Sequence, residues 1–135
     1  MWLESVAARS SSMADFKKLL VWQKAHALSL SIDRLTKRIR ASQYASFKSQ
    51  LFRAGLSIPA NIAEGRQKES EREFARFLGM AASSSSELES HLIFARDAKI
   101  IGEAEFASLV GQTIEVRKML YALIKRIRGD LLDEL

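Results

Sequence analysis

The side chains best placed to act together chemically form a polar row along one predicted helix, at steps of three, four, four and three residues. Its members are Gln50, Arg53, Ser57, Asn61 and Glu64. At these spacings they share one helix face, beside an apolar stripe. Polar groups so close to a core are costly unless they are hydrogen-bonded. We therefore expect either a hydrogen-bond network between helices or subunits, or the lining of a ligand groove, and we favour the network.

The two histidines, His26 and His91, do not suit a metal site of the kind that helical bundles carry. Di-iron bundles place a glutamate three residues before each of two histidines, whereas Gln23 and Leu88 occupy those positions here. Glu87 and His91 are four residues apart, which is typical of an ordinary surface pair. The sequence predicts no metal and no cofactor.

Catalytic nucleophiles are also poorly supported. The chain has no cysteine, and the serines at 83–86 have no neighbouring base that would activate them. The stretch at 65–68 lacks the glycine spacing of a phosphate-binding loop. We therefore predict that the protein is not an enzyme.

Composition predicts one soluble, helical domain. The 135 residues are 47% hydrophobic and 27% charged, and a chain of this length can bury a proper core. Six glycines and a single proline are too few for the many turns of an all-β fold. No apolar run is long enough to cross a membrane, so we expect no membrane partner. The absence of cysteine favours the reducing cytoplasm as the location.

Apolar periodicity predicts an all-α fold, an antiparallel up-and-down four-helix bundle. The expected helices cover about 16–40, 44–66, 70–99 and 103–128. Asp15 and Ser70 are the expected N-caps, the latter in a capping box with Glu73, and Gly65 and Gly102 are the expected stops. The predicted organisation is a flexible tail at 1–15, the bundle at 16–129 and an acidic tail at 130–135. Met13 is an alternative to Met1 as the native start.

Pro59 lies inside the second predicted helix. It removes a backbone donor and crowds the carbonyl of Gly55, at a cost of about 3 kcal/mol in a regular helix. Because the apolar period continues on both sides, we expect a kinked but continuous helix. A true break after Leu56 is the alternative.

The net charge of +5 is modest but unevenly distributed, and a basic excess favours contact with polyanions. The first and fourth helices carry the candidate nucleic-acid-binding residues Lys17, Lys24, Arg38, Lys118 and Lys125. The aromatic side chains fall on or beside apolar stripes and are expected in the core, so no aromatic platform for single-stranded nucleic acid is predicted. These aromatic residues are Trp22, Phe47, Phe74 and Phe77.

Several short patterns together resemble a known four-helix bundle family. They are Phe16-x-x-Leu19-x-Val21-Trp22-Gln23-x-Ala25, Gln50-x-x-Arg53-Ala54, the segment 57–65, Phe77-Leu78 and Glu87-Leu88-Glu89. The family includes the proteins encoded in intervening sequences of bacterial 23S ribosomal RNA genes and the accessory variability proteins of diversity-generating retroelements. The resemblance covers about 16–129. It implies a ring-like homopentamer and a role with nucleic acid. The chain departs from the family pattern between the first two helices, at 39–47.

Two functions from different classes follow. The leading hypothesis is an oligomeric helical scaffold that binds RNA or DNA through basic helix faces. The alternative is a protein-interaction module with no nucleic-acid binding. A small-molecule or enzymatic role comes third, because it requires a closed pocket around Asn61 and Glu64. Apolar residues outside the main stripes, including Leu19, Leu20, Phe52 and Ile114, independently favour a homo-oligomer.

Overall fold

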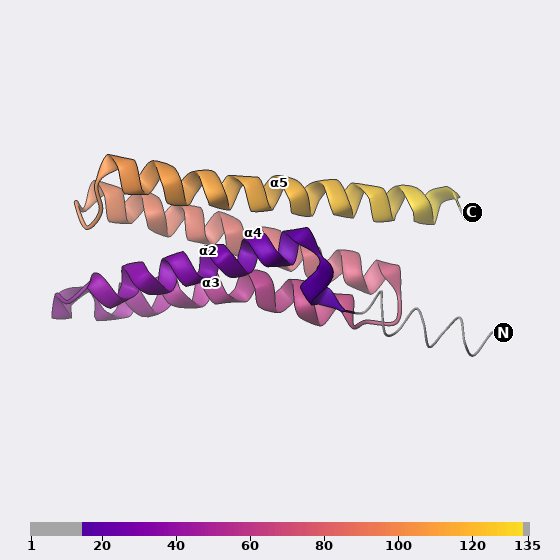
Figure 1. Cartoon of the computed structure of the whole chain (residues 1–135), viewed down its shortest axis with the longest axis horizontal. Coiled ribbons are helices and arrows are strands. Elements are labelled where there is room, and N and C mark those ends of the chain that lie inside the picture. Colours follow the sequence, from indigo (N-terminus) through magenta and orange to yellow (C-terminus); the bar gives the residue numbers. More distant parts are fainter. Residues whose placement is uncertain (1–14, 134–135) are drawn as a thin grey trace.

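Four long helices make up almost all of the computed structural model, which describes residues 15–133. They are α2 (Leu20–Arg38), α3 (Ala45–Arg66), α4 (Glu71–Asp97) and α5 (Glu103–Asp133), with short 3-10 turns η2 (Phe16–Lys18) and η3 (Ser42–Tyr44). Each helix runs antiparallel to the next, α3 packs against both α2 and α4, and α2 also contacts α5 (Figure 1). No strand occurs within the described range. The predicted all-α, up-and-down four-helix bundle is confirmed.

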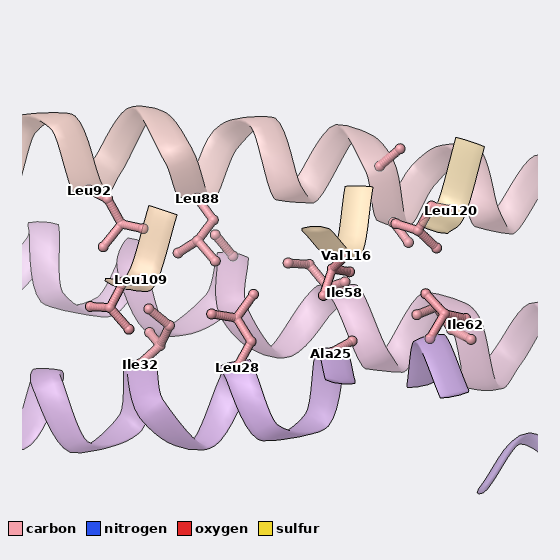
Figure 2. Packing of buried hydrophobic residues seen from close by; sticks show 14 of the residues in the cluster. Ala25, Leu28, Ile32, Ile58, Ile62, Leu88, Leu92, Leu109, Val116 and Leu120 are labelled. Atoms are coloured by element: carbon pink, nitrogen blue, oxygen red, sulfur yellow. The ribbon is translucent and has the colours of Figure 1, made fainter. Parts of the chain in front are cut away.

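The core runs along the centre of the bundle and uses one apolar stripe from each helix (Figure 2). Its fully buried side chains include Leu28, Ile32, Ile58, Ile62, Leu88, Leu92 and Leu120. Burying a side chain of this size contributes about 1.5–3 kcal/mol, so these stripes determine which face of each helix turns inward. In residues 15–133, no helix combines the length and apolarity that a bilayer-spanning segment requires.

The first helix begins later than predicted. Asp15 does act as a cap, but its carboxylate accepts from the Lys17 amide, at 3.1 Å, and caps η2. Leu19 then adopts an extended conformation, with φ −76° and ψ 124°. The continuous helix therefore starts at Leu20 rather than at 16. The predicted N-terminal tail and the choice between Met1 and Met13 lie outside the described residues, apart from Asp15.

Pro59 lies within a continuous α3, so the alternative of a break after Leu56 is wrong. Gly65 is not the stop that was predicted, because it lies inside the helix and is buried. A Cβ at Gly65 would come within 2.5 Å of the Phe77 Cβ. Only glycine therefore allows α3 and α4 to approach this closely. Gly55 similarly faces Ile32 of α2.

The connection from α4 to α5 differs from the predicted glycine stop. The helix ends at Asp97, and the left-handed residue is Lys99, with φ 61°, rather than Gly102. The Ile100 amide donates to the Ala95 carbonyl at 2.8 Å and closes the turn. At the other end of α4, Ser70 is the N-cap, because its hydroxyl accepts from the Glu73 amide at 3.1 Å. The serines at 83–86 are helical, as expected.

The last helix is longer than predicted. It continues to Asp133, beyond the predicted end at 128. The apolar period explains this extension, since Ile127 is buried and Leu131 packs against the core one turn later. The C-terminal end of α5 consequently projects beyond the loop that joins α3 and α4 (Figure 1).

Candidate nucleic-acid interface and the polar row

The polar row lies on the side of α3 that faces α4. Gln50, Arg53 and Glu64 are exposed, whereas Ser57 and Asn61 are half-buried. The Ser57 hydroxyl donates to the Ala54 carbonyl at 2.9 Å, and the Asn61 amide donates to the Ser57 carbonyl at 2.8 Å. Both bonds stay within α3, so these two groups are satisfied by the turn that precedes them. The described residues show no hydrogen bond from the row to another helix, and a role between subunits stays a prediction.

Part of the polar row lines a half-open hollow of about 400 Å³ between α3 and α4. The row contributes Gln50, Arg53 and Ser57, and α4 contributes Ser84 and Glu87. The hollow therefore combines one guanidinium, one carboxylate, an amide and two hydroxyls. Neither Asn61 nor Glu64 lines it, although a small-molecule role was predicted to need a closed pocket around those two residues.

The histidines occupy ordinary structural positions. His91 Nε2 lies 3.4 Å from the Glu87 carboxylate, the surface pair that their spacing predicted. The His26 ring stacks on Trp22, with centroids 4.8 Å apart and planes 9° from parallel. Within residues 15–133, no three His, Asp or Glu side chains gather in a way that could hold a metal ion.

The five basic candidates divide into two groups. Lys24 forms an ion pair with Glu115 of α5 at 2.8 Å, and Arg38 forms one with Glu105. Both pairs join α2 to α5, so part of the charge on these two side chains is neutralised within the bundle. Lys17, Lys118 and Lys125 are exposed, and the structure records no ion pair for them among the described residues.

The second half of α5 is a basic stretch without acidic residues; residues 34–63, which contain six Lys or Arg, are another. Residues 116–129, which we call the basic half of α5, contain five Lys or Arg residues and no Asp or Glu. Arg117 turns toward α4, where it bonds Glu89 at 2.5 Å and Ser86 at 3.4 Å. The other four, Lys118, Lys125, Arg126 and Arg128, are exposed.

Two of these residues, Arg126 and Arg128, were missed by the sequence prediction, although the absence of any acidic residue from 116–129 would have identified them. Tyr121 was missed as well: its side chain is 55% exposed in the middle of the basic half. Phe94, at the opposite end of the bundle, is 48% exposed. Phe74 and Phe77 are buried as expected, whereas Trp22 and Phe47 are half-buried.

The other ion pairs of the described residues each lie on a single helix. Arg76 Nη2 lies 3.0 Å from the Glu73 carboxylate on the first turns of α4. This hydrogen bond lowers the pKa of the Glu73 carboxyl and raises the pKa of the Arg76 guanidinium. The Glu73 side chain therefore engages Arg76, and only the Ser70 half of the predicted capping box forms.

Comparisons with known proteins agree with this architecture. None of the curated proteins compared with the chain matches it. A solved structure, of a protein of unknown function from the S23 ribosomal protein family of Bacteroides thetaiotaomicron, is similar at 28% identity with a TM-score of 0.74. The match covers 78% of this chain and 99% of that one. The family model described as 23S rRNA-intervening sequence protein matches residues 17–122. The chain therefore belongs to the family of 23S rRNA-intervening sequence proteins.

Proposed function

We propose that this protein is an oligomeric helical scaffold that binds RNA or DNA through the basic half of α5. The observation that carries the proposal is the concentration of exposed cations there, with no acidic residue from 116 to 129. Lysine and arginine side chains that contact phosphates release condensed counterions, and this release supplies most of the affinity of sequence-independent binding. Membership of the family supports the proposal only through the family's name.

The pairing of charges favours the α5 candidates over Lys24 and Arg38 as contacts. The Lys24 side chain is 41% exposed and its partner Glu115 is 53% exposed, so a phosphate would compete with a carboxylate already in place. Arg38 is in the same position with Glu105. Lys17 lies in η2, which precedes α2 at the end of the bundle where α5 has its C-terminus (Figure 1). We therefore propose Lys17, Lys118 and Lys125 as the nucleic-acid contacts from the predicted set, joined by Arg126 and Arg128.

Self-association is the second part of the proposal. Phe52 and Leu56 lie one turn apart on α3 and are exposed, as is Leu30 on α2. Phe52 also borders a shallow hollow of about 320 Å³, lined by Thr36, Lys37, Ala45, Lys48 and Ser49. Apolar side chains gathered on one outer face are typical of a contact surface, and we propose a second copy of the chain as the occupant. The pentamer itself rests on the resemblance, as does any relation to the accessory variability proteins.

Light scattering at micromolar concentration tests the assembly. We expect a mass of several chains, and we expect Phe52→Glu with Leu56→Glu to give a monomer with an unchanged helical circular dichroism spectrum. A wild-type monomer would contradict the proposed self-association. The proposed nucleic-acid binding would not be affected by that result.

A salt series of binding titrations tests the nucleic-acid part. We expect the logarithm of the association constant for RNA or DNA to fall linearly with the logarithm of salt concentration. Replacing Lys118, Lys125 and Arg128 with Gln should reduce that slope by about one unit for each phosphate that is no longer bound. Replacing Arg34, Lys37 and Arg40 of the α2 end with Gln removes the same charge elsewhere and is the matched control. Equal effects of the two triple variants would contradict the assignment to α5.

One observation favours the alternative, a protein-interaction module. Tyr44, Phe47 and Phe94 form an aromatic cluster, with the Phe47 and Phe94 ring centroids 4.9 Å apart. Exposed Ile93 lies next to Phe94 in the chain. A partner that stays bound after nuclease treatment, and that Phe94→Ala releases, would support this alternative.

A further inference from the structure

A single line of side chains runs along the basic half of α5 and one turn beyond each end, and it combines cations with apolar groups. Its members step by four, three, four, three and four residues, which keeps them on one helix face. They are Ile114, Lys118, Tyr121, Lys125, Arg128 and Leu132. All of them except half-buried Ile114 are exposed. Tyr121 therefore lies between two lysines, with an arginine one turn beyond.

Among the described residues, no recorded interaction of the Tyr121 ring explains its position. The core neighbours Leu120 and Ile124 are buried and already anchor this part of α5. Among residues 15–133, the structure records no hydrogen bond, ring stacking or cation–π contact for Tyr121. Other aromatics differ, since Trp22 contacts Phe16 and His26, and Phe106 lies under Arg96.

The face of α4 toward α5 carries small residues. Arg117 reaches Ser86 of α4, which identifies Ser86 as a residue on the face toward α5. Gly79 lies seven residues, or about two helical turns, before Ser86 and therefore on the same face. A Cβ at Gly79 would meet nothing within 4 Å.

The charges on this face are favourable for a chain of phosphates. Lys118 and Lys125 are two turns apart, or about 10 Å at 1.5 Å per residue, with Tyr121 between them. The α4 carboxylate on this side, Glu89, is occupied by Arg117 at 2.5 Å. An exposed aromatic ring flanked by cations is the arrangement with which proteins hold unpaired bases, because every base has a face that can stack.

We infer that the face formed by Lys118, Tyr121, Lys125 and Arg128 binds single-stranded nucleic acid, with one unpaired base stacked on Tyr121 and the flanking phosphates on the cations. The inference rests on the proposed function and narrows its substrate. A duplex presents phosphates to the same cations but offers no free base face along its length, so Tyr121 contributes little to duplex binding. The ring and the cations recognise features common to RNA and DNA.

Fluorescence anisotropy with labelled oligonucleotides in about 0.1 M salt tests the inference on the full chain. The probes are a short mixed-sequence RNA strand, the same sequence as DNA, and the duplex of each. We expect Tyr121→Ala to weaken binding of both single strands by about 5- to 150-fold, with duplex affinity unchanged within about twofold. Tyr121→Phe keeps the stacking surface and should bind like the wild type.

Phe94→Ala is the matched control, because it removes an exposed aromatic that packs on Phe47 of α3, away from α5. It should leave all four affinities unchanged, and circular dichroism checks that each variant is folded. If the wild type binds but Tyr121→Ala weakens single strands and duplexes equally, or neither, the stacking inference is overturned and the proposed function stands. If the wild type binds none of the four probes, the proposed function fails as well.

Discussion

The two halves of α5 carry opposite kinds of surface. The first half, residues 103–115, presents Glu105 and Glu115 to α2. Arg38 and Lys24 form ion pairs with these two carboxylates and so join α2 to α5. The second half presents cations that meet no carboxylate on a neighbouring helix within residues 15–133, apart from the inward pair of Arg117 with Glu89. The same helix therefore closes the bundle with one half and leaves exposed cations on the other. In the proposed function, the pairing of a basic residue matters more than its presence.

The largest expected effect comes from breaking the core where the two halves join. Leu120→Ala removes a fully buried side chain, and such substitutions cost about 2–5 kcal/mol of unfolding free energy. Urea denaturation followed by circular dichroism measures the loss. Because both halves share this core, the midpoint should fall for the whole helix in one transition. Two separate transitions would contradict a single cooperative bundle.

Neutralising the second half should affect binding and spare the fold. Lys118→Gln with Lys125→Gln removes two exposed charges, and surface changes of this kind usually stay within about 0.5 kcal/mol in stability. Affinity for RNA or DNA should fall by about tenfold for each phosphate that is no longer bound at 0.1 M salt. A loss of stability larger than the loss of binding would mean that these lysines serve the fold instead.

Neutralising the acids of the first half should lower stability slightly and strengthen nucleic-acid binding. Glu105→Gln with Glu115→Gln removes both carboxylates that pair with α2, and exposed ion pairs contribute about 0.2–1 kcal/mol each. The freed Lys24 and Arg38 and the rise in net charge should strengthen nucleic-acid binding. Thermal unfolding and binding titrations measure the two effects. Unchanged binding would show that α2 lies away from the bound strand.

The smallest effect concerns the turn that leads into the first half. Lys99 is left-handed, with φ 61°, a conformation that favours glycine. Lys99→Gly should therefore stabilise the protein by a few tenths to about 1 kcal/mol, and Lys99→Ala, which keeps the strain, is the control. Equal stability of the two variants would contradict the strain argument.

The sequence predicts the fold well because each helix carries a stripe of apolar residues with its own period. It predicts the continuity of α3 through Pro59 for the same reason. It does not predict that α5 continues past Gly129, because the contacts of Ile127 and Leu131 that support this extension form only in the assembled bundle. It also does not predict the left-handed Lys99, whose conformation follows from the turn that brings Ile100 back to Ala95.

The site is predicted less well than the fold, and the reason is the register between helices. Lys24 and Glu115 are 91 positions apart in the chain, and no periodicity within one helix shows that they meet. The same holds for Arg38 and Glu105. By contrast, the cations at 116–129 and Tyr121 lie within one helix. Their spacing, which places Tyr121 among the cations, is therefore visible in the sequence.

Lysine footprinting of the nucleic-acid complex tests the central claim most directly. The protein is acetylated with and without saturating RNA, and mass spectrometry measures the modified fraction of each lysine. We predict that Lys118 and Lys125 become protected while Lys37 and Lys48, at the other end of the bundle, react to the same extent in both samples. Protection of Lys37 and Lys48 with Lys118 and Lys125 still reactive would contradict the assignment of the basic half of α5 as the binding surface.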